Sequence, residues 1–273
     1  MGIKRICSRS EDYMRHRDAL KVQLRKRGYS GKQVDQQLQK VDRMERPELL
    51  TKHPTNCREL RLGSPSGVYN VTLTPGRIAD VYCDMDADGG PWTVIHNRQN
   101  GDVDFYRNWA EYKQGFGDLR GNFWAGRDNI HLLTQTGSIL RIQLMSWYND
   151  TGYAQYSNFS VGDESSKYRL SISGFSGNVL YDAMEYVDGY PFSTYDNDND
   201  AWIRNCAAIR HGAWWFEQCS YSHLKGPYVR DTGVNRESMY RWEFYSGRHI
   251  VPMMKSRMMV KQPCLYSGQT ENK

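Results

Sequence analysis

The chain has 273 residues, enough for one large domain and an additional segment, and aromatic residues make up 13% of it. This aromatic content, with 8 Trp and 19 Tyr, excludes a disordered chain, and the absence of any apolar run of about 18 residues excludes a membrane-spanning helix. The net charge is +5, but residues 1–53 alone carry +7, with fourteen Lys/Arg against seven Asp/Glu, which leaves −2 for the rest. We therefore expect a solvated basic helical segment and no nucleic-acid partner.

Residues 1–54 are predicted to form a helical extension. Two helices separated at Gly28 are expected within it, and Ser30 can cap the second. A narrow apolar stripe runs along them, formed by Met14, Leu20, Leu24, Val34, Leu38 and Val41. Because short isolated helices are marginally stable in water, this stripe needs a partner, either the other helix or another chain. The segment is therefore a candidate for self-association.

Short apolar runs separated by turn residues follow this extension, a pattern typical of β-strands. The runs are residues 67–73, 78–85, 91–97, 139–147 and 167–175. Between them, residues 108–117 and 127–137 favour short helices, with Asp128 placed to cap the second. The chain has no internal repeat of fixed period, which argues against a solenoid or a propeller. We expect one domain over residues 55–265 and a flexible tail over residues 266–273.

The cysteines favour an oxidising environment. They stand at positions 7, 57, 83, 206, 219 and 264, and no pair has the C-x-x-C spacing of a zinc knuckle or a thioredoxin-like site. Three glycosylation sequons, at Asn70, Asn149 and Asn158, also predict a secreted glycoprotein. The opening residues, MGIKRICSRS, contain no apolar stretch, so no signal peptide is expected in this sequence.

The segment YDNDNDAWIRNC, residues 195–206, spaces three aspartates one residue apart, at positions 196, 198 and 200. An EF-hand that starts at Asp196 would need Gly where Ala201 stands and Glu where Ala207 stands, so the segment is not an EF-hand. The chain also has no G-x-S-x-G, no H-E-x-x-H and no Gly-rich phosphate loop. We therefore expect no enzyme activity, and a metal bound at this segment would be structural.

A longer series of motifs carries a family resemblance. It consists of D-F-Y-R-N-W at 104–109, G-F-G at 115–117, F-W at 123–124 and N-I-H at 129–131, followed by FSTYDNDNDAWIRNCA. The series resembles the C-terminal globular domain of the fibrinogen family, which includes ficolins, tachylectin-type lectins and angiopoietin-like ligands, and the likeness covers about residues 55–264. It implies an α+β fold, with a central twisted antiparallel sheet, short helices and a loop-rich calcium and ligand subdomain, here preceded by the helical N-terminal extension.

The resemblance also implies the disulfides Cys57–Cys83 and Cys206–Cys219. Cys7 and Cys264 are left over, and the sequence does not decide whether they join each other, cross-link two chains or stay free.

In the family, the loop equivalent to residues 195–206 binds one calcium ion through two carboxylates and two backbone carbonyls. The carboxylates would be those of Asp198 and Asp200, and the carbonyls those of Trp202 and Arg204. Oxygen ligands of this kind suit calcium, and water completes its coordination. The alternative interpretation is an acidic, solvated turn.

The resemblance places a ligand pocket on the second disulfide, with a cis peptide bond between Gln218 and Cys219. The residues expected to contact ligand are Gln218, Cys219, Ser220 and Tyr245. Family lectins that recognise acetyl groups commonly have His directly after this cysteine, and this chain has Ser220 there. Recognition of acetylated sugars is therefore left open.

Together these features predict a secreted, calcium-containing, non-enzymatic lectin of innate defence that binds glycans on cell or microbial surfaces. One alternative is a receptor-binding ligand of the angiopoietin type. Another is a structural assembly domain, like that of fibrinogen, whose pocket receives a peptide end.

Overall fold

The computed structural model describes residues 19–45, 54–61, 63–230, 241–243 and 250–263. The chain divides into two compact units. One consists of residues 1–54, 59–65 and 263–273, and the other of residues 55–58 and 66–262. No helix in the described part of the chain combines the length and the hydropathy that crossing a bilayer requires.

The first unit contains the two expected helices. Residues 19–26 are helical, α2 spans Gly31–Glu45, and Gly28 lies between them with a φ of 82° that suits glycine. The side chains of Leu24, Val34 and Leu38 form a buried cluster with Leu20 against it. The two helices therefore cover part of their own apolar stripe. Self-association through this unit stays a prediction, and Met14 lies outside the described residues.

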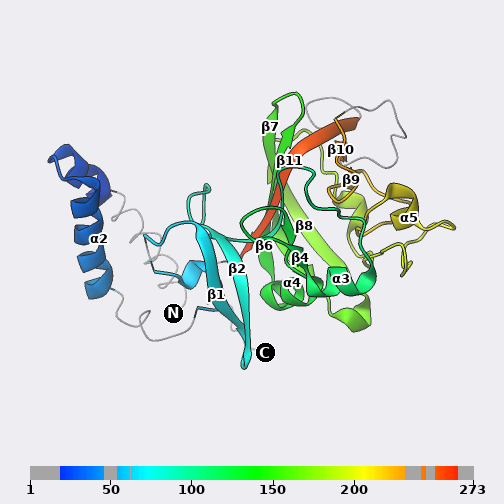
Figure 1. Ribbon diagram of the computed structural model, residues 1–273, viewed down its shortest axis with the longest axis horizontal. Helices are drawn as coiled ribbons and strands as arrows, with labels where there is room; N and C mark the ends of the chain where they lie inside the picture. Colours follow the sequence, from blue (N-terminus) through cyan, green and yellow to red (C-terminus); the bar gives the residue numbers. More distant parts are fainter. Residues whose placement is uncertain (1–18, 46–53, 62, 231–240, 244–249, 264–273) are drawn as a thin grey trace, which may run out of the picture. The chain divides into compact units, whose positions relative to one another are not determined.

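One antiparallel sheet forms the main body of the second unit. Its main path follows the order β1-β2-β3-β11-β6-β7-β8. The bounds are β1 Gly67–Thr74, β2 Arg77–Asp84, β3 Trp92–Arg98, β6 Ser138–Ser146, β7 Thr151–Val161, β8 Leu170–Gly177 and β11 Ile250–Lys261. Although β11 is the last strand in sequence, it lies between β3 and β6 and pairs with both (Figure 1). The end of the domain therefore joins the two halves of the sheet.

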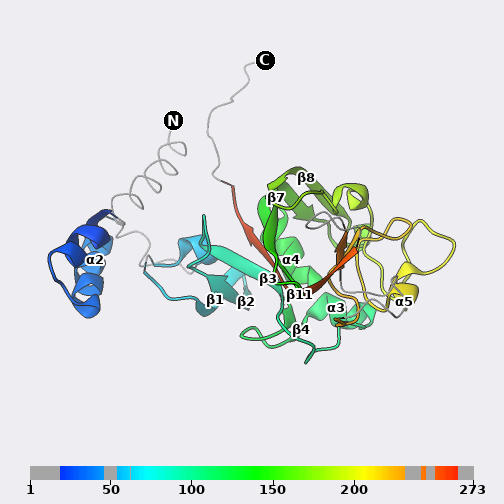
Figure 2. The same cartoon turned by 90° about the horizontal axis from the view of Figure 1, so that it is seen from above.

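Short elements complete the unit. They are α3 Trp109–Gln114, α4 Arg127–Thr134, α5 Cys206–Arg210, β4 Phe116–Gly117, β5 Phe123–Trp124, β9 Ser222–His223 and β10 Arg241–Glu243, with 3-10 turns at η2 Cys57–Glu59, η3 Glu164–Ser166 and η4 Glu185–Val187. In both views α5 lies at the end of this unit opposite β1 and β2 (Figures 1 and 2).

Side-chain alternation separates the two faces of the sheet. On β6, Leu140, Ile142 and Leu144 are buried, whereas the residues between them are only half-buried. The buried set shares the main core with Ile130 and Leu133 of α4. Helix α4 therefore covers this inner face of the sheet.

Residues with a strong capping preference mark the start of α3, whereas the capping residue expected for α4 does not cap it. The Asn108 side chain accepts from the backbone N–H of Glu111, and the Glu111 carboxylate accepts from the Asn108 N–H, which is a capping box. The expectation that Asp128 caps α4 is wrong. The N-cap is Gly126, with φ 88° and no side-chain cap, and the Asp128 carboxylate accepts instead from the Tyr168 hydroxyl at 2.5 Å.

Candidate metal and ligand site

The aspartate loop is held in shape by its own amides before any ion is considered. The Asn199 side chain donates to the Phe192 carbonyl at 3.0 Å and to the Asn197 carbonyl at 3.2 Å. The Asn205 side chain caps α5 by accepting from the Ala208 N–H at 2.8 Å. Since both ends of the loop are fixed by hydrogen bonds, the aspartates between them have set positions.

The three aspartates divide into one structural residue and one facing pair. Asp196 accepts from the backbone N–H of Trp109, the first residue of α3, at 2.9 Å, and from the Thr194 hydroxyl at 2.7 Å. It therefore attaches the loop to α3, and its negative charge is favourable at the helix start. Asp198 and Asp200 form the pair: their carboxyl groups interact, and the Asp198 side chain accepts from the Asp200 N–H at 3.3 Å.

Asp200 is the most constrained carboxylate of the loop. Its two oxygens accept from the backbone N–H groups of Trp202 at 2.9 Å and Cys206 at 2.8 Å. Burial raises the pKa of Asp200 to about 6, and the neighbouring Asp198 carboxylate adds to this rise against the opposing effect of the two N–H donors. Two like charges are thus held side by side, an arrangement that a cation would stabilise.

The donor set fits a calcium ion. Each Asp200 oxygen accepts one N–H, so lone pairs remain for a metal, and Asp198 is exposed with its carboxylate accessible. The described residues contain no group of three or more His, Cys, Asp or Glu side chains that could hold a metal, so backbone carbonyls and water would supply the other ligands. Trp202 is half-buried and Arg204 is exposed in the same loop. Bound calcium would neutralise the facing carboxylates and hold the loop closed.

The aspartate loop and the predicted ligand segment are joined directly. The Ala201 N–H, next to Asp200, donates to the Glu217 carbonyl at 3.0 Å. A disulfide joins Cys206, at the start of α5, to Cys219, with Cα atoms 5.5 Å apart. The peptide bond between Gln218 and Cys219 is cis, as the resemblance implies. A structural change in the aspartate loop can therefore be transmitted to the 217–221 segment through one hydrogen bond and one disulfide.

The predicted ligand residues lie at the surface of this junction. Gln218 is exposed, Ser220 is half-buried and Cys219 is buried. Tyr245 lies outside the described residues. Three tyrosines not identified from the sequence, namely Tyr181, Tyr186 and Tyr221, form a cluster that adjoins Ser220 through Tyr221.

The Tyr221 ring is the centre of this tyrosine cluster. It lies 5.0 Å from the Tyr186 ring and 6.0 Å from the Tyr181 ring, measured between centroids. Tyr186 is 47% exposed and Tyr221 is 37% exposed, so aromatic surface faces solvent next to the predicted pocket. Only Tyr221 could be placed there from the sequence, because it follows Ser220 directly. Tyr181 and Tyr186 are distant in sequence and are brought next to Tyr221 by the fold.

The remaining predicted positions lie elsewhere in the chain. A second disulfide joins Cys57 to Cys83, with Cα atoms 5.5 Å apart. The three sequon asparagines are exposed, at Asn70, Asn149 and Asn158. The two other cysteines, at positions 7 and 264, lie outside the described residues.

A family model of the C-terminal globular domain of fibrinogen beta and gamma chains matches residues 53–263. The chain belongs to this family. Human ficolin-3 is 39% identical to it over 212 residues, which cover 76% of this chain and 70% of ficolin-3. Mouse angiopoietin-related protein 7 is 46% identical over 179 residues, 64% of this chain and 52% of that protein. The fibrinogen-like domain described here thus spans about half the length of the second relative.

The fold agrees with that of solved family members. The fibrinogen-like globe domain of human ANGPTL2 superposes with a TM-score of 0.72 and 31% sequence identity, covering 77% of this chain and 99% of the globe domain. The fibrinogen-like fold expected from the motifs is therefore confirmed.

Proposed function

We propose that this fibrinogen-like domain is a secreted, non-enzymatic lectin of innate defence, in which a calcium ion at Asp198 and Asp200 braces a glycan-binding surface at residues 217–221. The observation that carries the proposal is the direct joint between the two parts. The hydrogen bond from Ala201 to Glu217 and the Cys206–Cys219 disulfide both connect the aspartate loop to the segment that bears Ser220. The similarity to ficolin-3 over most of both chains supports the same class.

The exposed surface beside this joint suits a sugar. Aromatic rings stack on the apolar faces of sugar rings, and the tyrosine cluster of Tyr181, Tyr186 and Tyr221 supplies such rings next to the amide of Gln218 and the hydroxyl of Ser220. Calcium would act here as a support for the segment, because its carboxylate ligands lie in the neighbouring loop.

A glycan array tests this proposal. Wild-type protein in calcium buffer is expected to bind a restricted set of glycans, and free N-acetylated sugar is expected to compete if acetyl groups are recognised. Tyr221→Ala should weaken the binding by about two- to tenfold, because one stacking ring is worth about 0.5–1.5 kcal/mol. Tyr148→Ala is the matched control, since Tyr148 is 56% exposed at the turn between β6 and β7. An array without bound glycans contradicts the lectin proposal.

A receptor-binding function of the angiopoietin type is the second candidate, and one feature of the aspartate loop favours it. Ile203 is 94% exposed between Trp202 and Arg204, and Leu180 is 71% exposed beside the tyrosine cluster. Projecting apolar side chains are more useful to a protein interface than to a sugar site. The identity to angiopoietin-related protein 7 fits this reading as well. Ile203→Ser should leave glycan binding unchanged and abolish binding to a protein receptor.

A further inference from the structure

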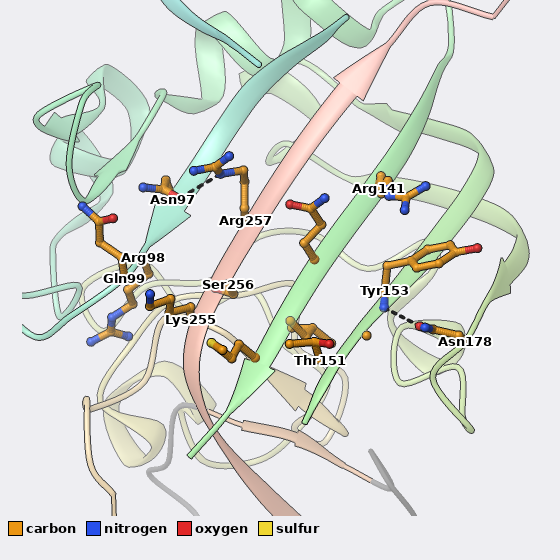
Figure 3. A pocket seen from close by; sticks show the side chains of 14 residues that line it. Asn97, Arg98, Gln99, Arg141, Thr151, Tyr153, Asn178, Lys255, Ser256 and Arg257 are labelled. Carbon is orange, nitrogen blue, oxygen red and sulfur yellow. Dashed lines mark hydrogen bonds between the residues drawn. The ribbon is translucent and has the colours of Figure 1, made fainter. Parts of the chain in front are cut away.

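A pocket lies on the sheet, formed without any residue of the aspartate loop or the 217–221 segment. It has a volume of about 480 Å³ and is lined from β3, β11, β6 and β7 and the residues that follow them. The sheet register brings Asn97, Arg257, Gln143 and Tyr153 into one row across the four strands. Figure 3 labels three members of this row, Asn97, Arg257 and Tyr153. On β6 these side chains alternate with the buried ones, so the pocket occupies the outer face of the sheet, opposite α4.

All charged residues that line this outer-face pocket are cationic. Its lining includes the cationic residues Arg98, Arg141, Lys255 and Arg257, and no residue of the lining is acidic. Arg98 is buried, and its guanidinium donates to the Gly226 carbonyl at 2.5 Å, so its charge is directed into the domain. The charge available to a ligand therefore comes from the other three.

These three cations are neighbours on adjacent strands. Arg257 lies opposite Gln143, and Arg141 is two residues along β6 from Gln143, so the two arginines are diagonal neighbours with Cα atoms about 7–8 Å apart. Lys255 is two residues from Arg257 on β11, about 7 Å along the strand. Three like charges on one sheet face repel one another, and an anion bound among them would reduce this repulsion.

Among the described residues, a carboxylate pairs with one of these three cations. Arg257 pairs with the Asp84 carboxylate at 2.6 Å and donates through Nε to the Asn97 side-chain oxygen at 3.1 Å. Arg141 lies over the Tyr153 ring at 3.8 Å, and its Nη1 reaches the Gln155 side-chain oxygen only at 3.5 Å. The pocket thus holds one arginine that is oriented by an aromatic ring and is not paired with a described carboxylate.

Two further observations point to an anionic ligand at this place. The Nε of Arg141 is buried and has no hydrogen-bond partner among the described residues. Lys255 is exposed at the mouth of the pocket. Arg141 as a whole is only half-buried, so an anionic group in the pocket could accept from the accessible part of its guanidinium, where the donors are not all satisfied within the domain.

We propose that the outer-face pocket binds an anionic sugar unit, sulfated or carboxylated, of a glycan chain. The cations would hold the sulfate or carboxylate, and the amides of Gln99, Gln143 and Asn178, which also line the pocket, can both donate to and accept from sugar hydroxyls. A volume of about 480 Å³ exceeds the need of a lone inorganic anion and suits a small organic ligand.

The same contacts argue against nucleic acid. Single-stranded nucleic acids stack their bases on exposed aromatic faces, but Tyr153 is the aromatic residue of the lining and the Arg141 guanidinium covers a face of its ring. An anionic membrane attracts basic residues that project from a surface, whereas these line a hollow on the sheet.

Calorimetric titration of the full chain with a sulfated heparin tetrasaccharide tests the proposal. Lys255→Gln and Arg141→Gln are each expected to weaken binding by about tenfold, the loss typical of one charge-assisted hydrogen bond. Because Lys255 is exposed, its replacement removes no packed side chain. Thermal melting identifies any unfolding caused by Arg141→Gln, and Arg141→Lys, which keeps the charge, should recover part of the affinity.

Matched controls separate this pocket from general basic charge. Lys26→Gln removes one exposed lysine of the basic helical unit, and Arg120→Gln removes one exposed arginine between β4 and β5. Both should bind the tetrasaccharide within about twofold of wild type, because neither lies in the pocket. Calcium chelation and Asp198→Asn should also leave this binding unchanged, so a failure here is distinguishable from a failure of the calcium-supported site.

Several results would overturn the proposal. Equal affinity of wild type, Lys255→Gln and Arg141→Gln would show that the ligand binds elsewhere, and an equal loss in Lys26→Gln would place it on the helical unit. A desulfated tetrasaccharide that binds as tightly as the sulfated one would exclude anion recognition. Displacement of the tetrasaccharide by an equal concentration of inorganic sulfate would show that the pocket binds only a small anion. Lys255-dependent binding to anionic lipid vesicles that is tighter than binding to the tetrasaccharide would instead assign the pocket to a membrane surface.

Discussion

Replacing Asp198 by Asn should have opposite effects in the presence and absence of calcium. Without metal, the Asp198 and Asp200 carboxylates repel each other, and Asp198 is exposed, so solvent screening limits the repulsion to no more than about 1 kcal/mol. Asn keeps the size of the side chain and the oxygen that accepts from the Asp200 N–H at 3.3 Å. In chelator the variant should therefore melt at the wild-type temperature or up to about 4 °C above it.

With calcium the order should reverse. An ion at about a hundred times its dissociation constant stabilises the folded state by about 2.7 kcal/mol, which raises the melting temperature of a domain of this size by about 5–10 °C. Asp198→Asn removes one of the two carboxylate ligands, so most of this rise should be lost. Differential scanning calorimetry of wild type and Asp198→Asn, each in calcium and in chelator, measures the four melting temperatures.

Asp196→Asn is the matched control for this experiment. Asp196 stands in the same loop but binds the Trp109 N–H and the Thr194 hydroxyl. Its replacement should lower the melting temperature by a similar amount in both buffers, because Asn keeps the accepting oxygen but removes the negative charge at the start of α3, which contributes about 0.3–1 kcal/mol with or without metal. A calcium-dependent rise in Asp198→Asn as large as in wild type, or its loss in Asp196→Asn alone, would refute the assignment.

Three further predictions follow from the fold. The double variant Cys206→Ser/Cys219→Ser should lose about 3 kcal/mol of unfolding free energy, since the disulfide closes a sequence separation of 13 residues; recovery of either cysteine as a free thiol in non-reducing peptide maps of wild type would contradict it. Burial, followed by the nearby Lys225 and Arg98, holds the pKa of His96 well below 6.5. The unfolded state therefore takes up this proton first, so stability should fall as pH drops below about 6.5, by up to about 1.4 kcal/mol per pH unit; a His96→Gln variant with the same slope would contradict this. Residues 1–54 are expected to self-associate, and light scattering that gives the mass of one chain, unchanged by deleting them, would exclude it.

Strands were predictable from sequence where their two faces differ. The run at 139–147 alternates apolar and polar residues because β6 buries one face only, and it was recognised. β11 was missed. Met258 and Val260 lie in the main core while Met259 packs on the other face against Trp92, so the strand is covered on both sides there and shows no alternation.

The candidate sites were predictable only as far as they are local in sequence. The spacing of Asp198 and Asp200 and the cysteine pattern indicated the aspartate loop, because these residues lie within a short segment. The separation of Asp196 from this pair depends on α3, which precedes the loop by many residues. The outer-face pocket depends on β11 pairing beside β6, which brings Arg257 near Arg141 and which no local pattern encodes.

The most direct test of the proposed function is the binding of uncharged glycans, for which the outer-face pocket offers no charge recognition, measured with and without calcium. If the aspartate loop braces the 217–221 segment, wild-type protein should bind its glycans in calcium, lose most of that binding in chelator, and regain it when calcium is restored. Asp198→Asn should bind weakly in both buffers, while Asp196→Asn should still respond to calcium. Binding of uncharged glycans by wild type that is equally strong in calcium and in chelator would contradict the account.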